Sequence, residues 1–172
     1  FSTGLATPRW NSGMFGTQPD PEAPNDVEFI REVLDRTLEK YPEIDTERIY
    51  VTGHSNGSIM TQLIMRKMPE RFAGFAPVGA MECSRMKTEA PTDGIKRNVW
   101  YTIGEYDGFG ISLEGDNPNT LTLKMICECN GLDYDSAKHY SCGIYNNTVI
   151  RDADKVPLVQ FAGITNFPHT YT

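Results

Sequence analysis

The fold of this chain is decided by residues 48–60, which read Arg-Ile-Tyr-Val-Thr-Gly-His-Ser-Asn-Gly-Ser-Ile-Met. The first part is a short apolar run rich in β-branched and aromatic residues, and it predicts a buried strand over residues 48–53. The second part starts a segment with apolar residues at helical spacing as far as Met68, just before Pro69, which predicts a helix over residues 56–68. A strand that leads through a sharp turn into a helix is typical of an α/β layer.

The turn between strand and helix, residues 53–57, matches the motif G-x-S-x-G. In a strand-turn-helix setting this motif predicts a nucleophile elbow, which holds the hydroxyl of Ser55 above the sheet. We expect both glycines to be required, because a Cβ at Gly53 or Gly57 would strike the neighbouring strand or helix. The backbone N–H of Asn56 should point at the negative oxygen that develops during attack on a carbonyl. The alternative is a glycine-rich connection without chemistry.

The rest of the chain repeats the alternation of strand and helix, which predicts a mainly parallel sheet with helices on both faces. The first 24 residues read as irregular, and no break in composition divides the chain. We therefore expect a single α/β domain over residues 1–172. A helix is predicted after Asn25 or Asp26, either of which can cap it, because apolar residues recur at helical spacing until Tyr41-Pro42 ends it. The further predicted elements are a helix over residues 120–130 and strands over residues 72–78, 98–103, 148–151 and 156–161.

A serine nucleophile on such a sheet needs a histidine base, and the chain has three histidines. In this arrangement the partners follow in the order serine, acid, histidine, each beyond the end of a later strand. His54 lies inside the elbow, so we expect its side chain to point away from Ser55. His139 falls in a polar stretch that reads as a solvated loop. Elimination favours His169, which follows the last predicted strand by a few residues.

The acid should lie in the loop after the strand over residues 98–103. That loop contains Glu105 and Asp107. We favour Asp107, which would orient the imidazole and stabilise its protonated form without taking the proton itself. Glu105 remains the alternative, since either carboxylate can serve. Asp93 and Asp116 are interpreted as turn residues.

The net charge of -7 argues against a nucleic-acid partner, which would need a basic face, and against binding to anionic membranes. No membrane span or signal peptide is visible, but Phe1 is not an initiator methionine, so a cytoplasmic and a secreted location both stay open. Cys127 and Cys129 are too close for the usual spacing of a zinc site, so we expect no zinc there. The disulfide state of the four cysteines is left open.

With these residues in place, the sequence resembles the polyhydroxybutyrate depolymerase and feruloyl esterase-like group of α/β-hydrolases, a carbohydrate esterase group. The resemblance rests on residues 25–30, 44–57 and 69–78, on the loops that hold Asp107 and His169, and on residues 10–13. It implies an α/β-hydrolase fold and hydrolysis of carboxylic esters through an acyl-enzyme on Ser55, with no metal and no cofactor. It implies substrates such as feruloyl or acetyl groups on polysaccharides, short-chain esters or polyhydroxyalkanoates.

The sequence also departs from this group. Its members carry several strands ahead of the region matching Phe1, including a His-Gly-type loop that gives a second oxyanion donor, and a closing helix after the histidine. We therefore expect a fold incomplete at both ends, or association with another chain that completes the sheet. Two other functions stay open: a serine peptidase of the same fold, and a noncatalytic remnant that binds a sugar or a partner.

Overall fold

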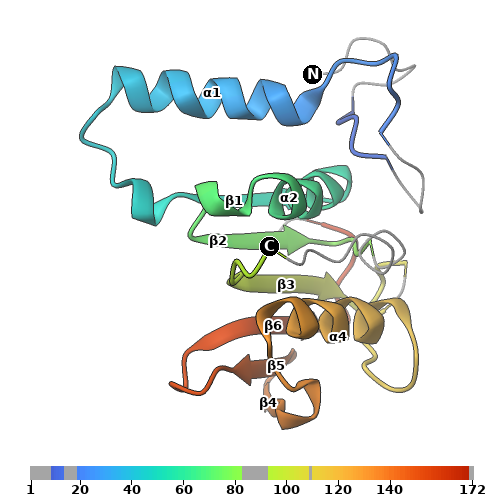
Figure 1. Cartoon of the computed structure of the whole chain (residues 1–172). Coiled ribbons are helices and arrows are strands. Elements are labelled where there is room, and N and C mark those ends of the chain that lie inside the picture. Colours follow the sequence, from blue (N-terminus) through green and yellow to red (C-terminus); the bar gives the residue numbers. More distant parts are fainter. Residues whose placement is uncertain (1–8, 14–18, 83–92, 109, 171–172) are drawn as a thin grey trace.

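The computed structural model describes residues 9–13, 19–82, 93–108 and 110–170, and these residues form a mixed six-stranded sheet in the order β1-β2-β3-β6-β5-β4 (Figure 1). β1, β2, β3 and β6 run parallel, and β5 and β4 complete the sheet as antiparallel strands. This confirms the mainly parallel sheet. The strands are Tyr50–His54 (β1), Gly74–Val78 (β2), Val99–Gly104 (β3), Lys138–Cys142 (β4), Tyr145–Arg151 (β5) and Pro157–Ile164 (β6).

Helix α1 spans Asp26–Lys40 and begins where the sequence indicates, because the side chain of Asn25 accepts the backbone N–H of Glu28. Helix α2 follows the predicted turn directly, and α4 begins with a proline in its first turn and ends at a glycine in the left-handed conformation. Three short 3-10 helices connect these elements. The bounds are Asn56–Lys67 (α2), Pro118–Asn130 (α4), Thr46–Arg48, Pro69–Arg71 and Tyr134–Ser136.

The two helices that pack on the described sheet, α2 and α4, share one face of it (Figure 1). Their buried side chains, Leu63 and Ile126 among them, form one cluster with Phe75, Val99 and Phe161, which alternate onto that face. We expected helices on both faces. On the opposite face of the described sheet, Tyr50 and Trp100 are exposed, so its centre has no helical cover in the described residues.

Strand β4 was not predicted. All five of its residues are exposed, so it has neither the apolar run nor the alternation that marks a strand in a sequence. It is an edge strand held by its antiparallel pairing with β5. His139 therefore lies in a strand and not in a loop, and its Nδ1 contacts Thr148 Oγ1 at 2.9 Å.

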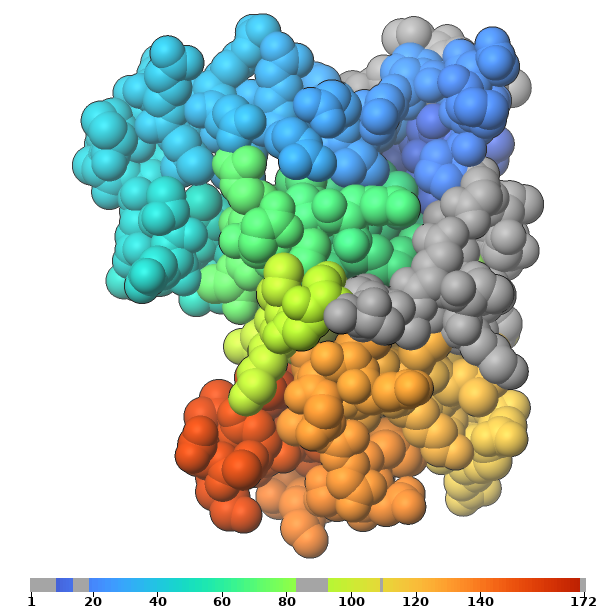
Figure 2. Space-filling model, in the orientation of Figure 1, coloured from blue at the N-terminus to red at the C-terminus, as the bar shows by residue number. Residues whose placement is uncertain are grey.

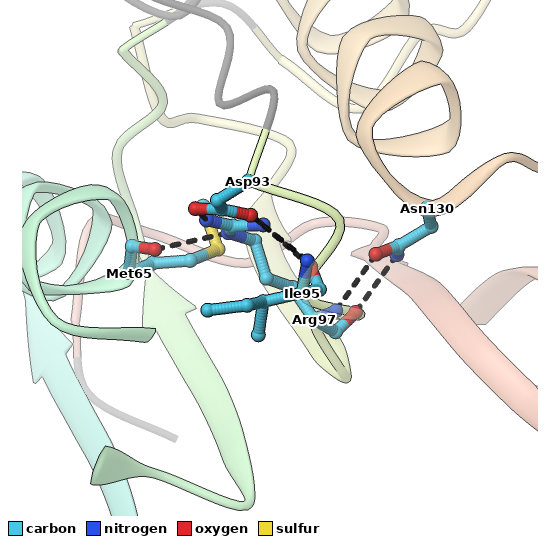
Figure 3. A network of polar contacts seen from close by, with 5 residues as sticks. All are labelled: Met65, Asp93, Ile95, Arg97 and Asn130. Atoms are coloured by element: carbon cyan, nitrogen blue, oxygen red, sulfur yellow. Dashed lines mark hydrogen bonds and ion pairs between the residues drawn. The ribbon is translucent and has the colours of Figure 1, made fainter. Parts of the chain in front are cut away.

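Residues 93–98 run between α2 and α4 before they enter β3 (Figure 2). Arg97 is the buried centre of this segment, with only 1% of its surface exposed. Its guanidinium donates to the carbonyl of Met65 at 3.0 Å and pairs with Asp93 at 2.6 Å (Figure 3). Its backbone N–H and C=O both bond to the side chain of Asn130, at 2.7 and 2.8 Å. The segment thus fastens α2 to α4, and Asp93 is more than the turn residue we expected.

The sheet brings the predicted reactive residues to one edge. His54 lies opposite Val78, and Gly104 lies opposite Ile164, so the carboxyl ends of the parallel strands coincide. The loops after these strands are where α/β sheets bind ligands. No helix in the described part of the chain is long and apolar enough to span a membrane.

Candidate active site

Ser55 occupies a strained turn between β1 and α2. Its backbone has φ 56 and ψ -114, a conformation that a residue with a side chain rarely adopts and that folded surroundings must enforce. Two backbone hydrogen bonds hold this conformation. Ser55 N–H donates to the carbonyl of Val78 at 2.9 Å, and Ser55 C=O accepts the N–H of Ser58 at 2.9 Å. The strand and the helix together fix the serine at the edge of the sheet.

The two glycines of the motif have different roles. A Cβ at Gly53 would lie 2.4 Å from the backbone oxygen of Gly57, so only glycine lets β1 and α2 meet this closely. A Cβ at Gly57 would meet no described atom within 4 Å. The prediction of a clash is therefore confirmed for Gly53 and wrong for Gly57, as far as the described residues are concerned.

Ser55, His169 and Asp107 form one chain of hydrogen bonds. His169 Nε2 lies 2.9 Å from Ser55 Oγ, and His169 Nδ1 bonds to Asp107 Oδ1. The second carboxylate oxygen of Asp107 accepts the backbone N–H of Gly104 at 2.6 Å. Asp107 is buried, whereas 46% of the His169 side chain is exposed. A carboxylate fixed in this way sets the tautomer and orientation of the imidazole and leaves Nε2 ready to take a proton from the serine.

The side chain of His54, which we expected to point away from Ser55, lies against the imidazole of His169. Its ring centroid is 4.5 Å from that of His169, with the two planes inclined by 39°. Gly79 leaves the space for this pair, since a Cβ there would come within 3.0 Å of His54 and 3.3 Å of His169. Burial first, and then the charge of His169, lower the pKa of His54 below its ordinary 6.5, while Asp107 acts the other way. The second imidazole is therefore held in its neutral form.

This neutral histidine predicts an acid-dependent loss of stability. Because the pKa of His54 is lower in the folded chain, the unfolded chain binds more protons below pH 6.5, and unfolding is favoured as the pH falls from there toward the folded pKa. Above that window the effect is absent. Replacing His54 by phenylalanine, which keeps a ring against His169, should make the melting temperature fall less on acidification than in the wild type. Parallel thermal melts across this pH range measure it, and equal slopes would contradict the assignment.

A cavity of about 240 Å³ opens beside Ser55 and His169. Its other wall comes from Ile59 of α2 and from residues 79–82, which include Met81. The buried side chain of Gln62 holds this wall, because its amide donates to the carbonyl of Ala80 at 3.1 Å and accepts the N–H of Glu82 at 3.0 Å. The cavity is mostly apolar and has the nucleophile at its side, so it can receive the apolar end of an acyl group.

Asn56 is placed to act through its backbone and its side chain. Its N–H, at the start of α2, makes no hydrogen bond to another described residue, so it is available to donate to a ligand. Its side chain accepts the N–H of Trp10 at 2.6 Å and donates to Ser12 Oγ at 3.3 Å. The segment over residues 10–13 is thereby tied to the elbow, which the sequence did not indicate.

The remaining candidates lie away from the reaction or serve it indirectly. His139 sits on edge strand β4, and Glu105, the alternative acid, accepts the backbone N–H of Asn166 instead of contacting an imidazole. In the described residues no cluster of three or more His, Cys, Asp or Glu side chains could hold a metal ion. Cys127, Cys129 and Cys142 are free thiols, and burial raises the pKa of Cys127 to about 12, while Cys83 lies outside the described residues.

Comparison with known proteins assigns the chain to a family. Residues 23–122, more than half of the chain, match the sequence profile of the prolyl oligopeptidase family. The chain belongs to this family. It has the α/β-hydrolase fold that the resemblance implied: it superposes on the acetyl xylan esterase from Aspergillus awamori with a TM-score of 0.64 and 19% identity, over 85% of this chain and 62% of the esterase.

Two curated relatives of this family member confirm the resemblance to depolymerases and carbohydrate esterases. Poly(3-hydroxyalkanoate) depolymerase C from Paucimonas lemoignei is 28% identical over 162 residues, which cover 81% of this chain and 39% of the depolymerase. The bifunctional acetylxylan esterase/xylanase XynS20E from Neocallimastix patriciarum is 31% identical over 70 residues, which cover 41% of this chain and 10% of that enzyme. The chain thus spans well under two thirds of these relatives.

Proposed function

We propose that the chain carries the catalytic part of a serine carboxylic-ester hydrolase. One observation carries this proposal: Ser55 Oγ, the His169 imidazole and the Asp107 carboxylate are joined by hydrogen bonds at the side of an apolar cavity. The relatives named above as depolymerase and acetylxylan esterase support the same chemistry.

The first half of the reaction forms an acyl-enzyme. Ser55 Oγ attacks the ester carbonyl as His169 Nε2 takes its proton, and Asp107 stabilises the resulting imidazolium. The carbonyl oxygen becomes negative, and the N–H of Asn56 is the group we assign to stabilise it, helped by the positive end of α2. Collapse of the tetrahedral intermediate breaks the bond to the alcohol, which leaves with the proton from His169.

The second half reverses these roles with water. His169 Nε2 takes a proton from a water molecule, whose oxygen attacks the acyl carbonyl held on Ser55. Collapse of this second intermediate returns the proton to Ser55 Oγ and frees the carboxylic acid. No step needs a group other than those of the chain and water.

For the substrate, we propose an ester of the polyester or acetylxylan type. The names of the relatives support both, and a cavity of about 240 Å³ fits a small acyl group better than a long chain. We further propose that the edge at β1 pairs with an additional strand, from the rest of a longer protein or from another chain. The name of the family supports a peptidase as the second candidate.

The test compares a matched aryl ester and aryl amide of the same short acid, with a fluorophosphonate probe as an independent measure of the serine. We expect turnover of the ester, little turnover of the amide, and one adduct by intact mass that peptide mapping places on Ser55. Faster cleavage of the amide would favour the peptidase. A folded chain that neither labels nor turns over the ester would contradict the proposal and favour the noncatalytic remnant.

A further inference from the structure

The loop that holds the acid and the loop that holds the base are bonded to each other along their length. Glu105 N–H donates to the carbonyl of Ile164 at 2.9 Å, and Tyr106 N–H donates to the carbonyl of Phe167 at 3.1 Å. These two bonds align residues 104–108 with residues 164–169. The loops approach closely at Gly104, where a Cβ would lie 2.7 Å from the oxygen of Phe167.

Two side chains of the acid loop hold Asn166, where the base loop turns. Glu105 Oε2 accepts the N–H of Asn166 at 2.6 Å, and Tyr106 Oη donates to Asn166 Oδ1 at 3.0 Å. Asn166 has φ 56, in the left-handed region, which asparagine enters more readily than other residues with a side chain. The short contact from a carboxylate to a backbone N–H is a charge-assisted hydrogen bond, stronger than a bond between neutral groups.

This turn lies three residues before His169, so its geometry decides where the imidazole sits. About half of the His169 side chain is buried: its ring nitrogens contact Asp107 and Ser55, and its ring lies 4.5 Å from that of His54. These two hydrogen bonds can form only if the backbone holds the ring within reach of both Asp107 and Ser55. Small displacements of a reacting group are costly, and about 1 Å can lower a rate about a hundredfold.

We propose that Glu105, assisted by Tyr106, is the positioning residue for the catalytic base: its carboxylate holds the Asn166 turn so that His169 reaches both Asp107 and Ser55. Glu105 touches no reacting atom in this arrangement. The proposal rests on the proposed ester hydrolysis for its kinetic readout, and it also makes a prediction about His169 that needs no substrate.

The test uses the full chain with Glu105→Ala, which removes the acceptor, and Glu105→Gln, whose amide oxygen can still accept the Asn166 N–H. Asp45→Ala is the matched control, because Asp45 also accepts a backbone N–H at the surface, from Glu47, but in the short helix before β1. We expect Glu105→Ala to lower kcat for the aryl ester by about 10- to 100-fold with KM nearly unchanged, and to slow fluorophosphonate labelling equally. Glu105→Gln should recover most of this loss.

Several results would overturn the positioning role of Glu105. Glu105→Ala with wild-type kcat, a loss that appears in KM alone, or a Glu105→Gln variant as impaired as alanine would overturn the proposal. A fall in melting temperature larger than that of Asp45→Ala, in proportion to lost activity, would make the role merely structural. If Glu105→Ala does not fold, Tyr106→Phe should show a smaller fall in kcat with the same unchanged KM.

A second readout separates this proposal from the esterase proposal. The proton on His169 Nδ1, bonded to Asp107, gives a far-downfield proton resonance in the wild type if the pair is formed. Glu105→Ala should broaden or abolish this signal, whereas Glu105→Gln and Asp45→Ala should keep it. A wild type that shows the signal but hydrolyses no ester would contradict the esterase proposal alone. An unchanged signal in Glu105→Ala would contradict the positioning role alone.

Discussion

The variant His169→Ala should lose about 10⁴- to 10⁶-fold in kcat for an aryl ester and should no longer react with the fluorophosphonate probe. The reason is geometric. His169 Nε2 lies 2.9 Å from Ser55 Oγ, and no other described side chain is hydrogen-bonded to that oxygen and able to take its proton. In the proposed mechanism Ser55 and His169 act as a unit, so Ser55→Ala and the double variant should be about as inactive as His169→Ala. Steady-state kinetics and intact-mass labelling measure both effects.

His139→Ala is the matched control for this experiment. His139 is exposed on β4, contacts only Thr148 among the described hydrogen bonds, and lies opposite that residue in the sheet. Its removal should leave kcat and KM within about twofold of the wild-type values, as expected for a surface substitution. Equal losses in the two variants would mean that the activity reports folding and not the base. An active His169→Ala variant would remove the assignment of the triad.

Asp93→Ala should lower the free energy of unfolding by about 3 kcal/mol, the lower end of the range for breaking a buried ion pair. The Arg97 side chain is 0% exposed, so losing Asp93 leaves a buried positive charge whose remaining guanidinium partners among the described residues are the carbonyls of Met65 and Ile95. Asp93 itself is 35% exposed, which places the estimate at the low end. Urea unfolding at neutral pH measures the change.

The double variant Asp93→Ala with Arg97→Met tests whether the unpaired charge of Arg97 causes this loss of stability. It removes the buried charge together with its partner, so it should be more stable than Asp93→Ala alone. The wild type should also lose stability in acid, because the hydrogen bond from Arg97 lowers the pKa of Asp93 below 3.8 and that stabilisation disappears as the pH falls through the folded value. A double variant no more stable than Asp93→Ala would contradict this account.

The sequence predicted the elements whose signals are local. Apolar spacing and an asparagine cap located α1, and a buried apolar run before a G-x-S-x-G turn located β1 and α2. Chain order then gave Ser55, Asp107 and His169, which the structure brings together. Strand β4 was missed because its stability comes from pairing with β5 and not from its own composition.

What the sequence could not show depends on contacts between distant segments. Nothing near His54 indicates that its ring lies on His169, because this contact joins β1 to the loop after β6 and needs the space left at Gly79. Glu105 and Asp107 are both carboxylates of one loop, and only the position of Asn166 separates their roles. The burial of Arg97 likewise depends on contacts with α2 and α4, which come from distant parts of the chain.

The wall of the cavity opposite the triad has a consequence for how such an enzyme could change. Gln62 fixes the backbone of residues 80–82 through amide contacts that do not depend on the neighbouring side chains. We therefore expect exchanges of Ile59 or Met81 for apolar residues of similar volume to reshape the cavity while the serine, the imidazole and the carboxylate stay in place. In the proposed mechanism, the residues that would set acyl preference are therefore separate from those that would break the ester bond, so selection, natural or in the laboratory, could alter the first while it leaves the second intact.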